Sequence, residues 1–158
     1  MSQPTSKAIS RDIVEAFYEA YDTRDPLQIA AFVDDDVEWN IYGPVDVMQV
    51  CGQWHGKAAV IERFTHAMPK IFENAYIERE CLLVDGDRSA LFGRITSKLR
   101  KTGRVISHRT AHFVNWRDGK IVSFRVISDS LDAAEQFIGH RIDLSADAVP
   151  RESNIVAL

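Results

Sequence analysis

Apolar residues recur at helical spacing near the start of the chain. The first stretch predicts a helix over about 9–22. Its apolar stripe consists of Ile9, Ile13, Phe17 and Tyr21, with Val14 and Tyr18 beside them. Asp25 and Pro26 are typical of a helix start, because aspartate caps the first turn and proline fits its backbone angle. We therefore expect a second, short helix that runs to about Val33 and ends at the run Asp34–Asp36.

A strand and a loop separate this helix from a third one. The segment 37–42 predicts a strand that Gly43-Pro44 closes, and 44–55 is expected to be a long loop. The third helix begins near Gly56, and its stripe consists of Val60, Phe64 and Met68. Pro69 must break or restart that helix, because proline has no backbone N–H to donate.

The second half of the chain changes to strand-like runs between short turns. Four strands are expected, at 76–84, 89–100, 105–116 and 120–128. Asp118-Gly119 is a strong hairpin signal, because both residues tolerate the backbone angles of a tight turn. A last helix is expected from about Ser130 to Phe137, with Gly139 as its end.

This order of elements favours the α+β class, because the helices are segregated from an antiparallel run of strands. A long antiparallel sheet twists and curls. Three helices on its concave face would leave a cone with an apolar pocket, which is the default site for a small molecule. The sequence thus predicts one domain over 9–139, with tails at 1–8 and 140–158.

Composition and charge narrow the possible functions. The 158 residues include 19 Lys and Arg against 23 Asp and Glu, a formal charge of −4. This balance argues against nucleic-acid binding, which needs a dominant basic face. No apolar run approaches the ~20 residues of a membrane span, and no secretory signal is visible. Cys51 and Cys81 are far apart and read as reduced thiols, so a cytoplasmic protein is expected.

One local exception is a basic stretch in the second half of the chain. We interpret it as a solvated hairpin end, with an anion-binding patch as the alternative; it consists of Arg94, Lys98, Arg100, Lys101, Arg104 and Arg109.

Three strings resemble the nuclear-transport-factor-2-like (NTF2-like) superfamily, in its SnoaL-like and ketosteroid-isomerase-related branch. They are AAFVDDDVEW at 30–39, GQWHGK at 52–57 and AHFVNWRDGKIV at 111–122. The resemblance implies an NTF2-like cone, in which a curled antiparallel sheet packs on three helices of the N-terminal half, with a short C-terminal helix. It implies little about function, since the fold hosts isomerases, dehydratases, epoxide hydrolases, cyclases and non-enzymes.

The catalytic positions of these relatives carry other residues here. The general-base carboxylate of steroid isomerases falls at Trp39 or Ile41, and their oxyanion acid falls at Ala111. Their helical tyrosine falls near Phe17, with Tyr18 beside it. Because a base and a proton-donating acid are both missing, classical steroid isomerisation is not expected.

The epoxide-hydrolase pattern is incomplete as well. It needs an Arg-x-Asp in a middle strand and an aspartate in the last strand. Arg94 keeps the arginine, whereas Thr96 and Val126 stand at the acidic positions.

The remaining candidates are few. Asp129 is the best general base, although its position before a helix also suits an N-cap, and Tyr18 is the candidate hydrogen-bond donor. Residues expected to line the ligand site, with core packing as the alternative, are Trp39, Tyr21, Arg94, Arg109, Phe113, Phe124 and Val126. An arginine inside the cone would favour an acidic ligand, because an unpaired buried cation is costly.

His108 and His112 are four residues apart but lie on a predicted strand. They would be ~13 Å apart there, too far to share one metal ion, so no metal and no cofactor is predicted. If Ala111 faces the pocket, His112 and Val114 face outward, where relatives commonly dimerise. We therefore expect a homodimer through the outer sheet face.

Two functions remain open from the sequence. One is a pocket protein that binds a small apolar or mildly acidic molecule, with cofactor-free acid–base chemistry of an isomerase, dehydratase or cyclase type. The other is a non-catalytic ligand-binding or dimeric interaction module, because the usual catalytic acids are substituted.

Overall fold

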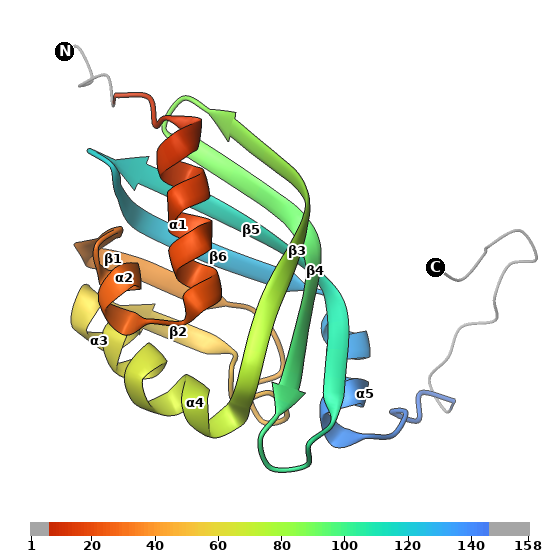
Figure 1. The fold of residues 1–158 in the computed structure, drawn as a ribbon. Helices are drawn as coiled ribbons and strands as arrows, with labels where there is room; N and C mark the ends of the chain where they lie inside the picture. The colour runs from red at the N-terminus through yellow and green to blue at the C-terminus, as the bar shows by residue number, and fades with distance from the viewer. Residues whose placement is uncertain (1–6, 146–158) are drawn as a thin grey trace, which may run out of the picture.

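In the computed structural model, which describes residues 7–145, a curled six-stranded sheet packs against helices (Figure 1). The helices are α1 Arg11–Thr23, α2 Pro26–Ala30, α3 Lys57–Glu62, the π-helical turn Arg63–Ala67, α4 Met68–Ile71 and α5 Ser130–Ile138. The strands are β1 Val33–Ile41, β2 Gly52–His55, β3 Phe72–Asp85, β4 Arg88–Leu99, β5 Val105–Arg117 and β6 Lys120–Ser128. The predicted α+β, NTF2-like cone is confirmed.

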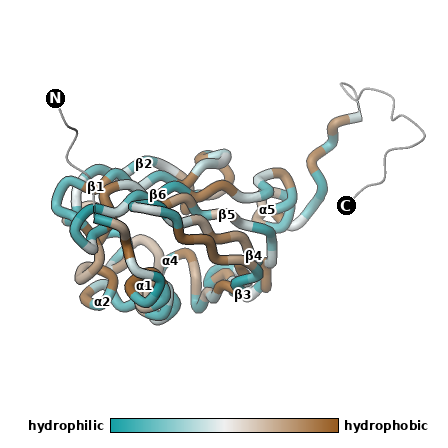
Figure 2. The backbone as a smooth tube through the Cα atoms, turned by 90° about the horizontal axis from the view of Figure 1, so that it is seen from above, coloured by the Kyte–Doolittle hydropathy of each residue, from teal (hydrophilic) through white to brown (hydrophobic). Residues whose placement is uncertain are grey.

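The sheet has the order β2-β1-β6-β5-β4-β3. Strands β3 to β6 form the expected antiparallel meander, whereas β1 runs parallel to β6, so the sheet is mixed. Helices α1, α2 and α4 lie on one side of this sheet (Figure 2). Helix α5 packs against β5 at one end of the cone.

Helix α1 begins at a serine cap and ends in a left-handed residue. The Ser10 hydroxyl accepts the Ile13 N–H, and Arg24 closes the helix with a φ of 59°. The buried residues of α1 are Val14, Phe17, Tyr18, Ala20 and Tyr21. Val14 and Tyr18 of the predicted stripe are buried, whereas Ile13 is 37% exposed, so the prediction is wrong for Ile13 alone.

The start of the sheet differs from the prediction. Strand β1 begins at Val33, not at 37, so the segment Asp34–Asp36 belongs to the strand rather than to a helix end. The pairing of β1 with β6 shifts between Val33 and Glu38, and this irregular segment directs its carboxylates to basic partners. Asp34 pairs with Arg117 at 3.2 Å, and Asp35 pairs with Lys57 at 2.8 Å.

Two further strand boundaries differ from the prediction. The predicted loop at 44–55 contains β2, a four-residue edge strand whose alternation is too brief to recognise. Strand β3 begins at Phe72, four residues before the predicted start.

Pro69 restarts the third helical segment, as expected. The helix loosens into a π-helical turn over 63–67, and Pro69 then lies in the first turn of α4. This turn buries Arg63, whose guanidinium stacks on the Trp54 ring at 3.6 Å and donates to the Val50 carbonyl. These contacts tie the segment before β2 to the helices and so fix one wall of the cone.

Aromatic side chains fill the narrow part of the cone. Trp39 and Phe124 stack with ring centroids 3.9 Å apart, and Phe17 contacts Trp116 and Phe124 edge to face. All of these side chains are at most 2% exposed. Because each buried side chain of this size stabilises the fold by about 1.5–3 kcal/mol, this cluster anchors α1 to the sheet.

The predicted tails lie mostly outside the described residues, which exclude 1–6 and 146–158. Within 140–145, the Ile142 N–H donates to the Glu135 carboxylate at 2.8 Å. None of the helices in the described part is both long and apolar enough to cross a membrane.

Candidate functional site

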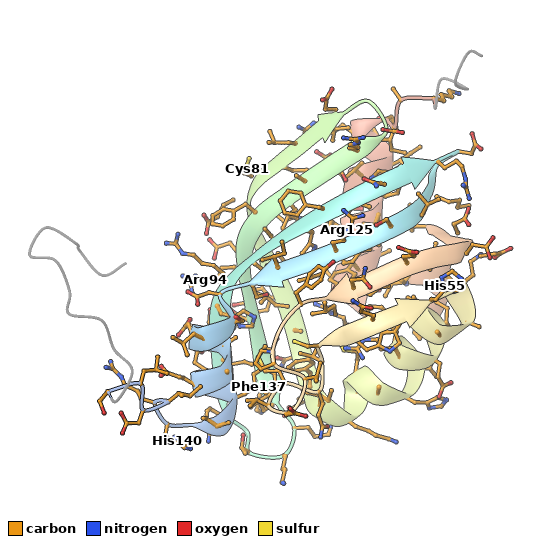
Figure 3. The ribbon with its side chains drawn as sticks, turned by 180° about the vertical axis from the view of Figure 1, so that it is seen from behind. His55, Cys81, Arg94, Arg125, Phe137 and His140 are labelled. Atoms are coloured by element: carbon orange, nitrogen blue, oxygen red, sulfur yellow. The ribbon has the colours of Figure 1, made fainter. Side chains whose placement is uncertain are left out.

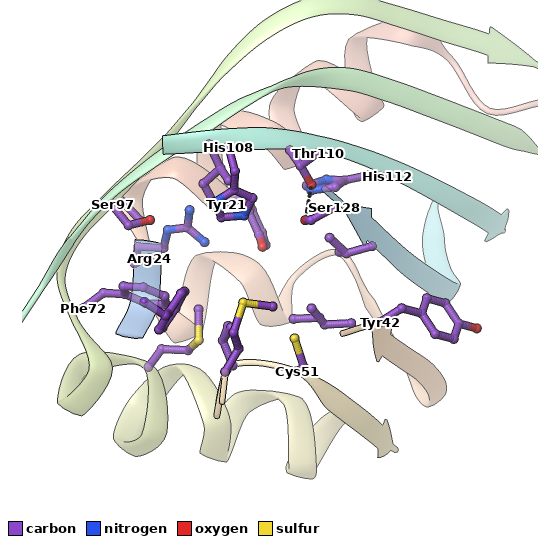
Figure 4. Close-up of a pocket in the computed structure, with 18 residues that line it drawn as sticks. Tyr21, Arg24, Tyr42, Cys51, Phe72, Ser97, His108, Thr110, His112 and Ser128 are labelled. Atoms are coloured by element: carbon purple, nitrogen blue, oxygen red, sulfur yellow. Dashed lines mark hydrogen bonds between the residues drawn. The ribbon is translucent and has the colours of Figure 1, made fainter. Parts of the chain in front are cut away.

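A partly enclosed cavity lies at the wide end of the cone (Figure 4). The end of α1, the segment 41–51, α4 and the inner face of β3 to β6 form its walls. The volume in which the centre of a water molecule fits is about 50 Å³, which is room for a few water molecules. The cavity therefore suits a small ligand, or one that displaces adaptable methionine side chains.

The lining is apolar on most sides, with polar groups gathered on the sheet. The apolar lining residues are Ile41, Met48, Val50, Met68, Phe72, Ala75, Ile95, Val126 and Phe137. The polar strip of the sheet consists of Ser97, His108, Thr110, His112 and Ser128. Alternate residues of β5 supply three of these, because side chains of a strand point to one face at every second position.

His112 is the most deeply buried member of the polar strip. It is 1% exposed, its ring stacks on Tyr18 with centroids 5.8 Å apart, and Phe124 contacts it edge to face at 5.0 Å. Nδ1 has no hydrogen-bond partner among residues 7–145. Burial lowers the pKa of His112 to about 3, and the positive charge of Arg24 adds to this effect. The imidazole is therefore neutral at physiological pH.

His108 lies four residues earlier on the same face of β5. Burial lowers its pKa, while Asp132 and Asp129 act in the opposite direction. Its Nδ1 also has no partner within the described part of the chain. His108 is thus a neutral imidazole. Its acidic neighbours make it a stronger proton acceptor than it would be without them.

Arg24 brings a positive charge into this cavity. Its side chain points into the cavity from the end of α1 (Figure 4). Nε, Nη1 and Nη2 are all buried and have no hydrogen-bond partner in 7–145, and the guanidinium lies 4.3 Å from the centre of the Tyr21 ring. Its left-handed backbone costs about 1 kcal/mol for a residue other than glycine.

Arg24 was not predicted, although the sequence holds a signal for it. Arg24 follows Phe17 by seven residues and Tyr21 by three, so it continues the face of α1 that Phe17 and Tyr21 bury. Arg24 is therefore the inward arginine that would favour an acidic ligand.

Four of the predicted lining residues do face the inside of the cone. Tyr21 and Val126 line the cavity. Trp39 and Phe124 pack in the aromatic core beside it, as the core alternative predicted. The Tyr18 hydroxyl is buried without a partner among the described residues, and burial raises its pKa well above the usual value, so Tyr18 remains protonated.

Three other predicted lining residues lie on the outer face. Phe113 is 48% exposed. Arg109 of β5 lies opposite Arg94 of β4 in the strand register, and both are on the same face as Phe113. Figure 3, viewed from the side opposite α1, labels Arg94 on this face. These three residues do not line the cavity, because their side chains lie on the opposite face of β4 and β5 from the one expected.

The same exchange of faces corrects the dimer candidates. His112 and Val114 are each 1% exposed on the inner face, so neither lies on an outer surface. Ala111, where the resemblance places the oxyanion acid, lies on the outer face next to Phe92. The inward positions on either side of it are Thr110 and His112.

Asp129 lies outside the cavity. It is exposed and caps α5, where its carboxylate accepts the Asp132 N–H at 3.3 Å. The structure thus gives Asp129 the capping role that its sequence context allowed, and its position does not support a role as general base.

The basic stretch and the cysteines are accounted for locally. Arg104 donates to the carbonyls of Gln136 and Phe137 at the end of α5, and Arg100 donates to the Pro69 carbonyl. Cys51 is a free thiol in the cavity wall, and Cys81 is a free, exposed thiol. Residues 7–145 contain no group of three or more side chains that could hold a metal ion.

A curled sheet closed by helices around an apolar cavity with a few polar groups defines a class of cone-shaped pocket proteins. Within this class the chain belongs to the SnoaL-like domain family, whose model matches residues 14–124. Among curated protein sequences, none matches the chain.

Solved structures share this fold. A protein from Rhodopseudomonas palustris, described as a candidate isomerase, is 30% identical, with 81% of this chain and 94% of that chain covered and a TM-score of 0.68. TerC, co-crystallised with polyporic acid, is 22% identical, with 80% and 96% covered and a TM-score of 0.70. A protein with a ketosteroid isomerase-like fold from Catenulispora acidiphila, in complex with trimethylamine, is 15% identical, with 90% and 100% covered and a TM-score of 0.68.

Proposed function

We propose that residues 9–139 form a single small-molecule-binding domain, whose cavity performs cofactor-free acid–base chemistry of the isomerase type. The observation that carries this proposal is the cavity itself, in which apolar walls face one polar strip on the sheet (Figure 4). Small-molecule sites typically combine such walls with a few convergent polar groups. The isomerase description of the Rhodopseudomonas palustris relative favours the same class of reaction.

In this proposal, imidazoles rather than carboxylates perform the acid–base chemistry. No aspartate or glutamate lines it. His108 is the proposed proton acceptor, because acidic neighbours partly offset the effect of burial on its pKa. His112, with a pKa of about 3, is too weak a base at neutral pH and is proposed as a hydrogen-bonding group. Tyr18 supports it by stacking on its ring.

The test is a screen of small fragments by two-dimensional NMR of the ¹⁵N-labelled protein. Bound fragments are expected to shift amide signals of Ser97, His108 and His112. Ala75→Phe, which fills the cavity, should abolish these shifts, whereas Ala111→Phe adds the same ring to the outer face and should preserve them. Fragments that bind equally well to the Ala75→Phe variant would contradict the proposal.

A specific observation also favours a homodimer, either of the enzyme or of a non-catalytic module. The outer face of the sheet presents a patch of exposed apolar side chains that includes Leu83 (61% exposed), Phe92 (39%), Phe113 (48%) and Ile127 (50%). Contiguous exposed apolar patches mark interaction sites. We propose that a second copy of this chain covers the patch, in place of the contacts expected through His112 and Val114.

The free thiols of Cys51 and Cys81 support the proposed cytoplasmic location, where cysteines stay reduced.

A further inference from the structure

Arg24 is the one formally charged side chain that lines the cavity in the described part of the chain. No lysine, aspartate or glutamate accompanies it there. Its three guanidinium nitrogens are buried and form no hydrogen bond with any residue in 7–145. A guanidinium has five N–H donors, and within the described residues none of those of Arg24 is used.

The fold itself does not account for this arginine. The helix cap needs only a residue with a left-handed backbone, which glycine adopts without strain. The ring face of Tyr21 and the carbonyl end of α1 favour a positive charge but leave the N–H groups unbonded. The neighbouring carboxylate of Asp22 contacts Arg79 of β3 instead, at 3.8 Å.

The other lining residues of the cavity define which ligand could pair with the Arg24 charge. His108 and His112 are both neutral, so they add no second positive charge and instead offer hydrogen bonds. One cation balances one negative charge. The opposite walls are hydrocarbon and sulfur, from residues such as Met48, Met68 and Phe72.

We propose that the ligand is a small monocarboxylic acid, bound as its anion with the carboxylate on Arg24 and an apolar body against Met48, Met68 and Phe72. This inference rests on the proposed function and names the substrate class of the same cavity. A carboxylate matches the fork of a guanidinium, which can donate two parallel hydrogen bonds to it. A phosphate or a dicarboxylate would leave a negative charge unpaired beside neutral imidazoles, and a cation would be repelled.

The test compares carboxylates with amides of the same shape, using sodium butyrate against butyramide and sodium benzoate against benzamide. NMR titration of the full chain measures each affinity. The wild-type protein is expected to bind each carboxylate about tenfold more tightly than its amide, because the charged pair replaces a neutral contact. Arg24→Gln should remove this preference while the amides still bind, and Arg24→Lys should keep only part of it.

Arg109→Gln is the matched control, because it removes the same charge from the outer face. It should leave the preference for carboxylates unchanged. Loss of the preference in Arg109→Gln, rather than in Arg24→Gln, would place the anion on the outer face and overturn the inference.

The remaining outcomes separate the two proposals. Equal binding of carboxylates and amides to the wild-type protein would overturn the inference and leave the small-molecule cavity standing. If none of the four compounds binds although fragments of the NMR screen do, the inference fails and the small-molecule cavity stands. If no fragment binds either, both proposals fail.

The melting temperature of the ligand-free protein gives an independent readout. Because Arg24→Gln removes a buried, unpaired charge, it is expected to raise the melting temperature by roughly 2–4 °C. A clear fall in melting temperature would show that the Tyr21 ring and the carbonyl end of α1 already stabilise the guanidinium in the ligand-free protein, and that result would overturn the inference.

Discussion

Burial sets the charge state of the individual side chains that surround the cavity. A buried guanidinium keeps its proton under all ordinary conditions, whereas a buried imidazole gives up its proton because the charged form loses its hydration. His112 is such an imidazole, and the charge of Arg24 lowers its pKa further. The result is a site with one fixed positive charge and two neutral hydrogen-bonding rings.

The pKa of His112 leads to a prediction about acid stability. An unfolded imidazole takes up a proton below about pH 6.5, whereas the folded protein protonates His112 only near pH 3. The unfolded state therefore binds more protons between these values, and stability falls as the pH falls. The contribution of His112 to the free energy of unfolding should drop by about 2 kcal/mol between pH 7 and pH 5.

Urea unfolding at the two pH values measures this effect. His112→Phe should lose less stability than the wild-type protein on acidification, by about 2 kcal/mol. The stability of His112→Phe should still depend on pH to some extent, because burial also lowers the pKa of His108. His55→Gln, at an exposed histidine, is the control and should behave as wild type. Identical pH dependence in wild type and His112→Phe would contradict the assignment.

At the scale of the element, strand β5 shows what the sequence could and could not predict. The resemblance aligned Ala111 with an inward catalytic position, and a shift of one residue along a strand exchanges its two faces. The charged residues of β5 indicated the correct orientation of the strand, because Arg109 and Arg117 share the face of Ala111 and both are exposed. Alternation of charge was thus a better guide to orientation than the aligned motif.

Short or irregular elements were the other limit of prediction. Strand β2 has four residues and lies at the sheet edge, so its alternation is too brief to separate it from a loop. The segment Asp34–Asp36 belongs to β1 only because the pairing with β6 shifts there. Both features depend on tertiary pairing, which a local pattern does not contain.

The start of α5 carries a prediction that separates capping from catalysis at Asp129. Asp129→Ala should lower the free energy of unfolding by about 1 kcal/mol, because the helix loses its cap. Asp129→Asn should retain nearly all of the stability, since asparagine caps equally well. Both variants should bind fragments in the cavity as the wild type does. An Asp129→Asn variant with normal stability but altered fragment binding would restore a direct role in ligand binding for this carboxylate.

At the scale of the whole molecule, the fold followed from the sequence more fully than the site did. The helical stripes, the four long strands and their glycine turns are local signals, and together they define the cone. The direction of the Arg24 side chain depends on the left-handed end of α1, and the cavity volume depends on packing between distant segments. The helical spacing of Phe17, Tyr21 and Arg24 indicates only the side of α1 on which Arg24 lies, and no local pattern gives the cavity volume.

The apolar patch on the outer face leads to a prediction about the assembly. Sedimentation velocity at micromolar concentration should give about twice the 17.9 kDa of one chain. Phe113→Glu should shift the protein toward the monomer, because it places a charge in the centre of the patch. Leu27→Glu, at an 80% exposed residue of α2, should leave the dimer intact. A monomeric wild-type protein would refute the proposed dimer.

The most direct test of the central claim is a crystal structure of the protein purified from cells without added ligand. The expected result is density for a small molecule in the cavity, with an acidic group within hydrogen-bond distance of the Arg24 guanidinium and an apolar part against Met68 and Phe72. A collapsed cavity, with Arg24 paired to a carboxylate of the protein or turned into solvent, would contradict the claim.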